Sequence, residues 1–97
     1  EMKFSIAALN KVFDSRIRLG IMAILAVNDD LDFNGLKEYL EVTDGNLASH
    51  LKALEKEEYI EVKKSFVGRK PNTRYAMTAK GRAAFGEHLK GLQSLIR

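Results

Sequence analysis

The spacing of apolar side chains changes abruptly near residue 59. From 44 to 58, leucines recur every three or four residues, which is the spacing of one buried face of a helix. From 60 to 67, apolar and polar side chains alternate, which is typical of a strand, and a second strand is predicted over 73–78. The intervening residues 68–72, Gly-Arg-Lys-Pro-Asn, have the composition of a turn. The chain is therefore expected to contain a helix that leads directly into an antiparallel hairpin.

Helical spacing also marks four other segments. These helices are predicted over about 3–13, 15–27, 34–41 and 79–96, with a short extended piece over 31–33. Polar residues able to cap the helices precede them, namely Asp14 or Ser15, Asn34, Thr43 and Thr78. The link before the helix over 44–58 is about three residues long, as in a helix-turn-helix. We predict one domain, residues 1–97, that is mainly α with a small antiparallel β-wing: a winged helix-turn-helix with flanking helices at its N- and C-terminal ends.

Composition excludes several classes of protein. The 97 residues include no cysteine, which excludes disulfides and thiolate-based sites. No apolar run approaches the roughly 20 residues of a membrane span, and the first residues lack the features of a signal peptide, so we expect a cytoplasmic protein with no membrane partner. The two histidines, His50 and His88, belong to no cluster with metal-ligand spacing. We expect no enzymatic activity, no metal and no cofactor.

Positive charge is concentrated in the second half of the chain. The net charge is +3, yet residues 59–97 carry nine basic and two acidic side chains, a net charge of +7. Five of the basic residues lie between 63 and 78 without an acid: Lys63, Lys64, Arg69, Lys70 and Arg74. A charged hairpin can simply protect the edge of a sheet. This density of charge favours a nucleic acid, with Arg69 and Lys70 at a narrow minor groove or its phosphates, and Lys64 and Arg74 at the DNA backbone.

The helix over 44–58 is the candidate recognition helix. If its leucines face the core, its outward face carries small and polar side chains that suit the major groove of double-stranded DNA. The predicted contacts are Thr43, Asn46, Ser49, His50, Lys52 and Ala53. Glu55, Glu57 and Glu58 favour a solvated surface toward the C-terminal end, but recognition helices insert their N-terminal part.

Several short motifs occur together in an order seen in known proteins. Ser49-His50-Leu51 and Leu54 are followed by Tyr59-Ile60, by the basic hairpin and by Met77-Thr78-Ala79-Lys80-Gly81. Together they resemble the DNA-binding core of MarR-type and ArsR-type winged-helix regulators, and especially the small stand-alone regulators of prokaryotes, over about residues 13–85. The resemblance implies a sequence-specific transcriptional regulator, most often a repressor, although the residues themselves do not separate repressor from activator. Glu58 departs from the family, which usually has a glycine there to end the helix in a left-handed turn.

The two end helices carry more apolar side chains than a minimal winged helix needs. These are Met2, Ile6, Leu9 and Phe13 in the first helix, and Phe85, Leu89, Leu92 and Ile96 in the last. They can pack on the protomer's own core, or they can form a two-fold homodimer interface, as the end helices of similar regulators do. We favour the homodimer, which would place two recognition helices on half-sites about one DNA turn apart. Gly81, Gly86 and Gly91 weaken the last helix for a reason that the sequence does not reveal.

Two other interpretations remain open. Winged helices also serve as protein-protein interaction modules, in which case the basic hairpin would be dispensable and DNA binding would be weak and nonspecific. A pocket between the end helices and the DNA-binding core could also bind an unidentified small-molecule effector, which is compatible with DNA binding.

Overall fold

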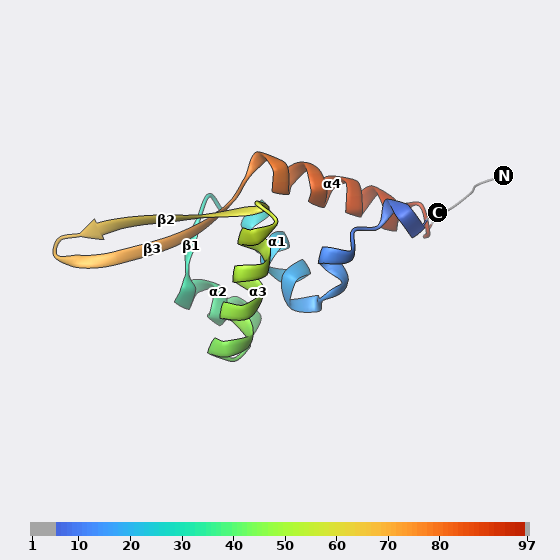
Figure 1. The fold of residues 1–97 in the computed structure, drawn as a ribbon. Coiled ribbons are helices and arrows are strands. Elements are labelled where there is room, and N and C mark those ends of the chain that lie inside the picture. The colour runs from blue at the N-terminus through green and yellow to red at the C-terminus, as the bar shows by residue number, and fades with distance from the viewer. Residues whose placement is uncertain (1–5, 97) are drawn as a thin grey trace.

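A bundle of helices forms the body of the molecule, and a long antiparallel hairpin projects from one side of it (Figure 1). The computed structural model describes residues 6–96. Its elements are the 3-10 turns η1 (Ile6–Ala8) and η2 (Lys11–Asp14), helices α1 (Arg16–Ala26), α2 (Phe33–Leu40), α3 (Asp44–Lys56) and α4 (Ala79–Gln93), and strands β1 (Leu31–Asp32), β2 (Ile60–Val67) and β3 (Lys70–Met77). This order confirms the mainly helical architecture with a small antiparallel wing.

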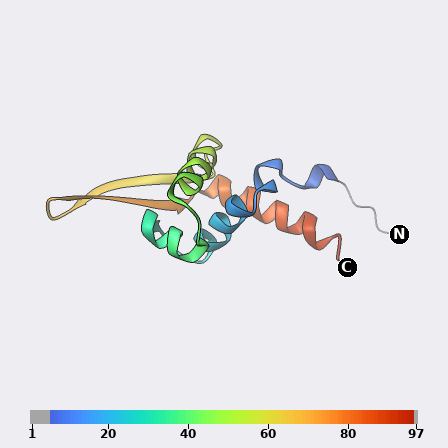
Figure 2. The ribbon, with the colours of Figure 1, turned by 90° about the horizontal axis from the view of Figure 1, so that it is seen from below.

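The core lies where α1, α2 and α3 meet. Ile21, Met22 and Leu25 of α1 are fully buried, and Leu36 of α2 packs against them together with the leucine face of α3. Phe13 extends this core toward α4, because its ring lies 5.8 Å from that of Phe85 between ring centroids. The hairpin and α4 leave the core in opposite directions (Figure 2), which gives the molecule its extents of 60 × 26 × 21 Å.

The sheet has the strand order β1-β3-β2, and both pairings are antiparallel. β2 and β3 pair along their whole length, and the last pair, Val67 with Lys70, leaves Gly68 and Arg69 as a two-residue turn. Gly68 has a φ of 66°. A type II′ hairpin turn requires a positive φ at the first of its two central residues, and glycine adopts it readily. β1 pairs only with residues 74–75, so it supports the base of the hairpin and leaves the rest free.

The wing tip is shorter than the sequence predicts. The second strand begins at Lys70, not at 73, and the turn is confined to two residues instead of 68–72. Pro71 therefore lies inside β3, opposite Phe66. Pairs alternate along an antiparallel ladder between those that exchange backbone hydrogen bonds and those that do not, and the pair that closes a two-residue turn exchanges them. The next pair, Phe66 with Pro71, needs no N–H from the proline, so the strand tolerates it.

The continuous helix predicted over 3–13 is wrong for the part of that segment that the structure describes. The 3-10 turns η1 and η2 flank Asn10, whose backbone is extended with a φ of −94° and a ψ of 119°. The backbone N–H of Asn10 donates to Nδ1 of the buried His88 over 3.0 Å, and its side-chain amide donates to the Tyr59 hydroxyl over 2.9 Å. Its side-chain oxygen also caps η2 by accepting from the N–H of Val12. These contacts with distant residues outweigh the helical spacing of the apolar side chains.

The other helices lie close to their predicted ranges. Ser15, Thr43 and Thr78 cap α1, α3 and α4 as expected. Helix α2 is capped by Asp32 and not by Asn34, because Oδ1 of Asp32 accepts from the N–H of Gly35 over 2.8 Å. Helix α4 ends at Gln93, before the predicted 96.

Helix α3 ends in a Schellman motif with a glutamate at the left-handed position. The N–H of Tyr59 donates to the carbonyl of Leu54 over 3.0 Å, and the N–H of Glu58 donates to that of Glu55 over 2.9 Å. Glu58 has a φ of 64°, in the region where a β-carbon is unfavourable. The helix therefore ends as the family's glycine would make it end, but with a strained residue.

We expect Glu58→Gly to stabilise the fold by about 1 kcal/mol, because glycine adopts a positive φ without a steric penalty. The substitution would also remove the exposed ion pair with Lys80, 3.4 Å between Nζ and Oε1, which contributes little to stability. Urea unfolding measures the change. Glu57→Gly is the matched control. Glu57 has a φ of −78°, which is unstrained, so glycine there should lower the stability of the protein. Equal effects of the two substitutions would contradict the strain at Glu58.

Helix α4 begins against the corner that follows α3. The Thr78 hydroxyl accepts from the N–H of Gly81 over 2.9 Å and donates to the carbonyl of Glu58 over 2.6 Å. The N–H of Thr78 donates to the carbonyl of Tyr59 over 3.1 Å. A β-carbon at Gly81 would lie 2.0 Å from that same carbonyl oxygen, so only glycine lets the two backbones meet. This close approach accounts for one of the three glycines of α4.

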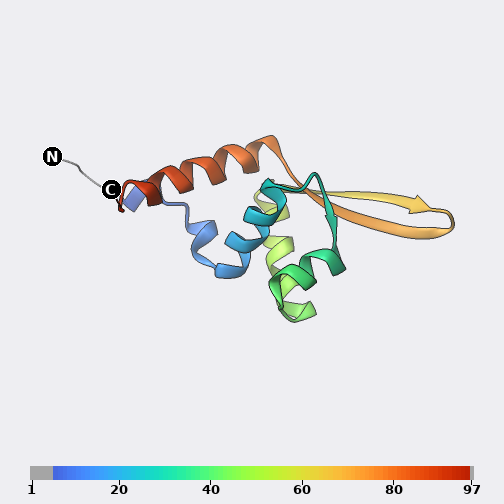
Figure 3. The same cartoon turned by 180° about the vertical axis from the view of Figure 1, so that it is seen from behind.

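Gly91 has a similar but looser role. A β-carbon there would lie 3.1 Å from the carbonyl oxygen of Ala8, where η1 runs beside the C-terminal part of α4 (Figure 3). Gly86 has no neighbour within 4 Å of such a β-carbon. Two of the three glycines thus mark places where another backbone approaches α4.

Candidate nucleic-acid interface

The outward face of α3 is fixed by the leucines that hold the opposite face in the core. Thr43 caps the helix, with its hydroxyl accepting from the N–H of Asn46 over 3.3 Å. Thr43, Asn46, Ser49 and Lys52 are exposed, whereas Ala53 is half-buried. The structure thus places four of the six predicted contacts on one accessible surface at the N-terminal part of the helix.

His50 is held at the edge of this surface by a residue from α1. The Nε–H of Arg18 donates to Nδ1 of His50 over 3.0 Å, and Arg18 also reaches the carbonyl of Val12 over 3.5 Å. Desolvation by burial lowers the pKa of His50, and the positive charge of Arg18 lowers it further. The imidazole is therefore neutral at pH 7, with its proton on Nε2. His50 can offer DNA one N–H donor but no positive charge.

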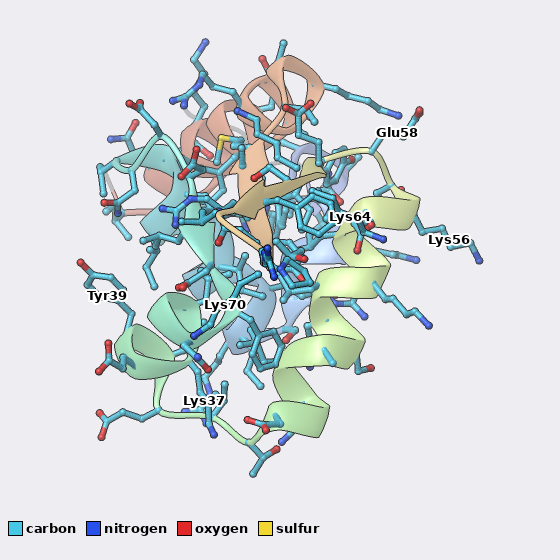
Figure 4. All side chains as sticks on the ribbon, turned by 90° about the vertical axis from the view of Figure 1, so that its left-hand side faces the viewer. Lys37, Tyr39, Lys56, Glu58, Lys64 and Lys70 are labelled. Carbon is cyan, nitrogen blue, oxygen red and sulfur yellow. The ribbon has the colours of Figure 1, made fainter. Side chains whose placement is uncertain are left out.

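The wing exposes three basic side chains beyond the sheet's base. Lys64, Arg69 and Lys70 are exposed, and none takes part in the ion pairs found among residues 6–96. Viewed along the hairpin toward the core, Lys64 and Lys70 come from the wing at the centre, with Lys56 on α3 at one side (Figure 4). The distal wing is thus a positively charged projection without a neutralising acid.

Arg74 has a different environment from the other wing residues. Its Nε–H donates to Oδ1 of Asp30 in an ion pair, and Nη2 donates to the carbonyl of Asp30 over 3.3 Å. The pair fastens β3 to the loop that precedes β1. Arg74 therefore anchors the base of the wing. Unlike the other predicted wing contacts, Lys64, Arg69 and Lys70, its guanidinium is already paired with a carboxylate of the protein.

A hollow joins the outward face of α3 to the base of the wing. Its volume is about 280 Å³, and its walls include Ser49, Lys52 and Glu55 of α3 together with Phe33 and Tyr75. Burial raises the pKa of Tyr75, and the carboxylate of Glu55 raises it further, so the phenol stays protonated as a hydrogen-bond donor. Helix α3 and the face of the hairpin that carries Tyr75 therefore border one concave surface.

The predicted dimer residues separate into two groups. Phe13 and Phe85 are buried in the protomer's own core, with exposed fractions of 3% and 8%, so they are not available as an interface. Met2 lies outside the described residues. The others lie in or next to η1 and in or just after the C-terminal half of α4, which run side by side at the end of the molecule opposite the wing (Figure 1). We call this end the apolar end; its large apolar side chains, all exposed or half-buried, are Ile6, Leu9, Leu89, Leu92, Leu95 and Ile96.

Sequence reasoning missed Phe66 at the tip of the wing. The alternation over 60–67 puts Phe66 on the same face of the strand as Ile60, which is buried. The structure leaves 73% of Phe66 exposed, because the hairpin extends beyond the core that would cover it. The length of the hairpin could have indicated this exposure, because strands of eight residues reach beyond a small helical core.

The part of the chain that the structure describes holds no cluster of three or more His, Cys, Asp or Glu residues suited to a metal ion. Within the same residues, no helix combines the length and apolarity needed to cross a lipid bilayer.

Comparison with known proteins gives three findings. The sequence profile of the family described as winged helix DNA-binding domain matches residues 17–96. An uncharacterized protein of Methanocaldococcus jannaschii is 43% identical over 87 residues, which cover 90% of this chain and 95% of that protein. A transcriptional regulator homologue of Pyrococcus horikoshii has a solved structure with a TM-score of 0.77 and 29% identity, over 94% of this chain and 95% of that one.

More distant solved structures share the fold. The YusO protein of Bacillus subtilis has a TM-score of 0.80 at 20% identity, over 94% of this chain and 64% of that one. A MarR-family transcriptional regulator of Silicibacter pomeroyi has a TM-score of 0.69 at 21% identity, over 82% of this chain and 53% of that one.

Proposed function

Because the chain belongs to the winged helix DNA-binding domain family, we propose that it is a sequence-specific transcriptional regulator that binds double-stranded DNA as a homodimer and represses transcription. One observation carries this proposal: the polar outward face of α3 and the base of the positively charged wing border the same concave surface. A duplex on that surface would meet hydrogen-bonding groups and positive charge together.

The two elements would contribute differently to binding. The N-terminal part of α3 enters the major groove, where Asn46, Ser49 and Lys52 reach base edges or flanking phosphates. His50 adds a neutral N–H donor, held in orientation by Arg18. Arg69 and Lys70 lie over the adjacent minor groove or its phosphates. The helix would then read sequence, while the wing supplies most of the affinity that depends on charge.

Replacing Lys52 with alanine is expected to lower affinity for specific DNA roughly tenfold or more, the size of effect that a base or phosphate contact of this kind produces. Fluorescence anisotropy would compare the DNA upstream of the protein's own gene with random-sequence DNA. Lys56→Ala is the matched control, because Lys56 is also an exposed lysine of α3 but lies at the C-terminal end of the helix. The change at Lys52 should exceed that at Lys56 severalfold.

Other outcomes would change the functional conclusion. If the parent protein binds both DNAs equally weakly, sequence-specific regulation is wrong, and an interaction module without specific DNA binding becomes the better description. If Lys56→Ala weakens binding as much as Lys52→Ala, the helix does not insert by its N-terminal part. Repression itself is tested by in vitro transcription from the upstream DNA, which should fall as protein is added.

The homodimer is proposed to form through the apolar end. Ile6 and Ile96 are 77% and 84% exposed, and Leu89 is 42% exposed, although all three are large apolar side chains. Clustered exposed apolar surface of this kind is typical of an interaction site. Self-association would cover it and would place the two wings at the far ends of the dimer.

We expect Leu89→Asp to convert the dimer to a monomer and to weaken DNA binding, because a carboxylate would be buried in an apolar interface. Sedimentation equilibrium measures the mass, and circular dichroism checks that the fold persists. Val27→Asp is the control, since Val27 is 82% exposed in the loop after α1, away from the apolar end. A monomeric parent would refute the homodimer while leaving DNA binding to be judged on its own.

A further inference from the structure

The free end of the wing carries apolar side chains that no part of the described chain covers. Phe66 is 73% exposed and Val67 is 66% exposed, and Pro71 beside them is exposed as well. Solvent-exposed hairpin ends are usually polar, and a large aromatic ring left in water there adds nothing to the stability of the fold. The tip therefore has a feature that stability does not explain.

The register of the hairpin shows which way Phe66 faces. Residues directly opposite each other in an antiparallel pair share one face, and every second pair along the ladder shares it too. Phe66–Pro71, Lys64–Thr73 and Val62–Tyr75 are such pairs. Tyr75 lines the hollow beside α3. Phe66 thus lies on the face of the wing that continues the concave surface, whereas Val67 lies on the other face.

Pro71 supports the ring from across the hairpin. It stands directly opposite Phe66, in the pair that does not exchange backbone hydrogen bonds and in which side chains come closest. Its ring fixes its own φ, so the backbone beneath the phenyl ring is stiffened. Phe66 and Pro71 together make an apolar point near the end of the wing.

The surroundings of this point fit a polyanion. Lys64, Arg69 and Lys70 lie within a few residues of Phe66 on the two strands and the turn, and residues 62–78 contain no acid. An apolar side chain surrounded by positive charge at the end of a projection suits a groove between two phosphate backbones.

The width of the minor groove limits what can enter it. The groove of B-form DNA is about 6 Å wide, whereas the two strands of a hairpin are separated by about 4.8 Å between their backbones alone. The ribbon cannot descend into the groove, so only side chains at its tip can. Apolar side chains that enter the minor groove insert between base pairs and kink the duplex, most easily at pyrimidine–purine steps.

We propose that Phe66, supported by Pro71, is a wedge that inserts into the minor groove at a deformable base step and bends the DNA. This inference rests on the proposed function, because it assumes that the concave surface receives a duplex. It adds a second source of sequence preference: the step beneath the wing is selected by its ease of unstacking, without a hydrogen bond to a base.

The test uses the full chain and DNA that the parent protein itself selects from a pool of duplexes with a randomised central segment. The selected duplex carries fluorophores at both ends, so energy transfer reports bending. A second duplex replaces its pyrimidine–purine steps with a stiff A-tract. Phe66→Ala removes the wedge, and Phe66→Leu keeps an apolar side chain. Val67→Ala is the matched control on the opposite face. Because Phe66 and Val67 are exposed, we expect these substitutions to leave the fold intact, and thermal unfolding of each variant checks this.

The parent is expected to bend the selected duplex and to bind it about tenfold more tightly than the stiff one, because the stiff sequence resists deformation. Phe66→Ala should abolish both the bend and the preference but leave the salt dependence of binding unchanged. Phe66→Leu should retain much of each, and Val67→Ala should match the parent.

Four outcomes would overturn the wedge, the last of them together with the proposed function. The parent could bind with steep salt dependence but without bending, in which case DNA binding stands and the wedge does not. Val67→Ala could impair bending as much as Phe66→Ala, which would indicate general apolar contact. Phe66 could promote binding to vesicles of anionic phospholipid and have no effect on DNA bending, which would assign the tip to a membrane surface. Failure of the parent to bind any duplex would remove the proposed function together with the wedge.

Discussion

Replacing Gly81 with alanine is expected to destabilise the protein by at least about 2 kcal/mol, within the range known for forcing an atom into a packed site. The added β-carbon would lie 2.0 Å from the carbonyl oxygen of Tyr59, and that oxygen already accepts the N–H of Thr78. Relief would require α4 to move away from the end of α3, which would break this bond and the Thr78 cap. In a domain of this size the loss corresponds to a fall of roughly 10 °C in the melting temperature.

The control for this substitution lies in the same helix. Gly86→Ala places a β-carbon where nothing lies within 4 Å, so it should raise stability by up to about 1 kcal/mol through helix propensity. The opposite signs of two chemically identical substitutions make the measurement decisive. If Gly81→Ala does not fold well enough to study, the double substitution with Gly86→Ala restores part of the stability. A Gly81→Ala variant as stable as the parent would contradict the close approach of the two backbones.

The double substitution Arg69→Ala and Lys70→Ala is expected to weaken DNA binding by about ten- to a hundredfold at roughly 0.1 M salt. Each phosphate neutralised by a basic side chain adds about 0.9 to the slope of log affinity against log salt concentration, so the slope should fall by about one to two. Both side chains are exposed at the wing's end and neither forms an ion pair within residues 6–96, so the fold should be unaffected. Anisotropy titrations across salt concentrations measure the slope directly.

A charge-matched control separates a local contact from a general effect of net charge. Arg82→Ala with Lys90→Ala also removes one arginine and one lysine, from exposed positions on α4 that are distant from the tip of the wing and from the N-terminal part of α3. This control should change the slope little. If the two double variants behave alike, the wing is not a contact and the protein attracts DNA only through its overall charge.

Local patterns were sufficient for most of the fold. The leucines of α3, the alternation over 60–67 and the capping threonines act over short distances, and each lies where the pattern predicts. Asn10 shows the limit of such reasoning. Its extended backbone is set by His88 and Tyr59, far away in the sequence, and no local pattern contains that information.

The candidate site was predictable to a similar degree. The outward direction of α3 follows from its buried leucines, so the exposure of Asn46, Ser49 and Lys52 could be inferred. The pairing of Arg74 with Asp30 could not, since it depends on β1 lying against β3. The exposure of Phe66 could not be inferred from alternation either, because alternation indicates a face and says nothing of whether another element covers it.

The unsupported length of the wing has a consequence for its motion. Every residue from Lys63 to Pro71 is exposed, so the outer half of the hairpin is held only by its own ladder, while the base is fastened by β1 and by the pair between Arg74 and Asp30. Amide hydrogens near the tip should therefore exchange with solvent through local opening, whereas those near Ile60 should exchange only when the whole domain unfolds. If the tip contacts DNA as proposed, it loses conformational freedom on binding, and this loss opposes binding. Stiffening the turn would therefore tighten DNA binding without adding a contact.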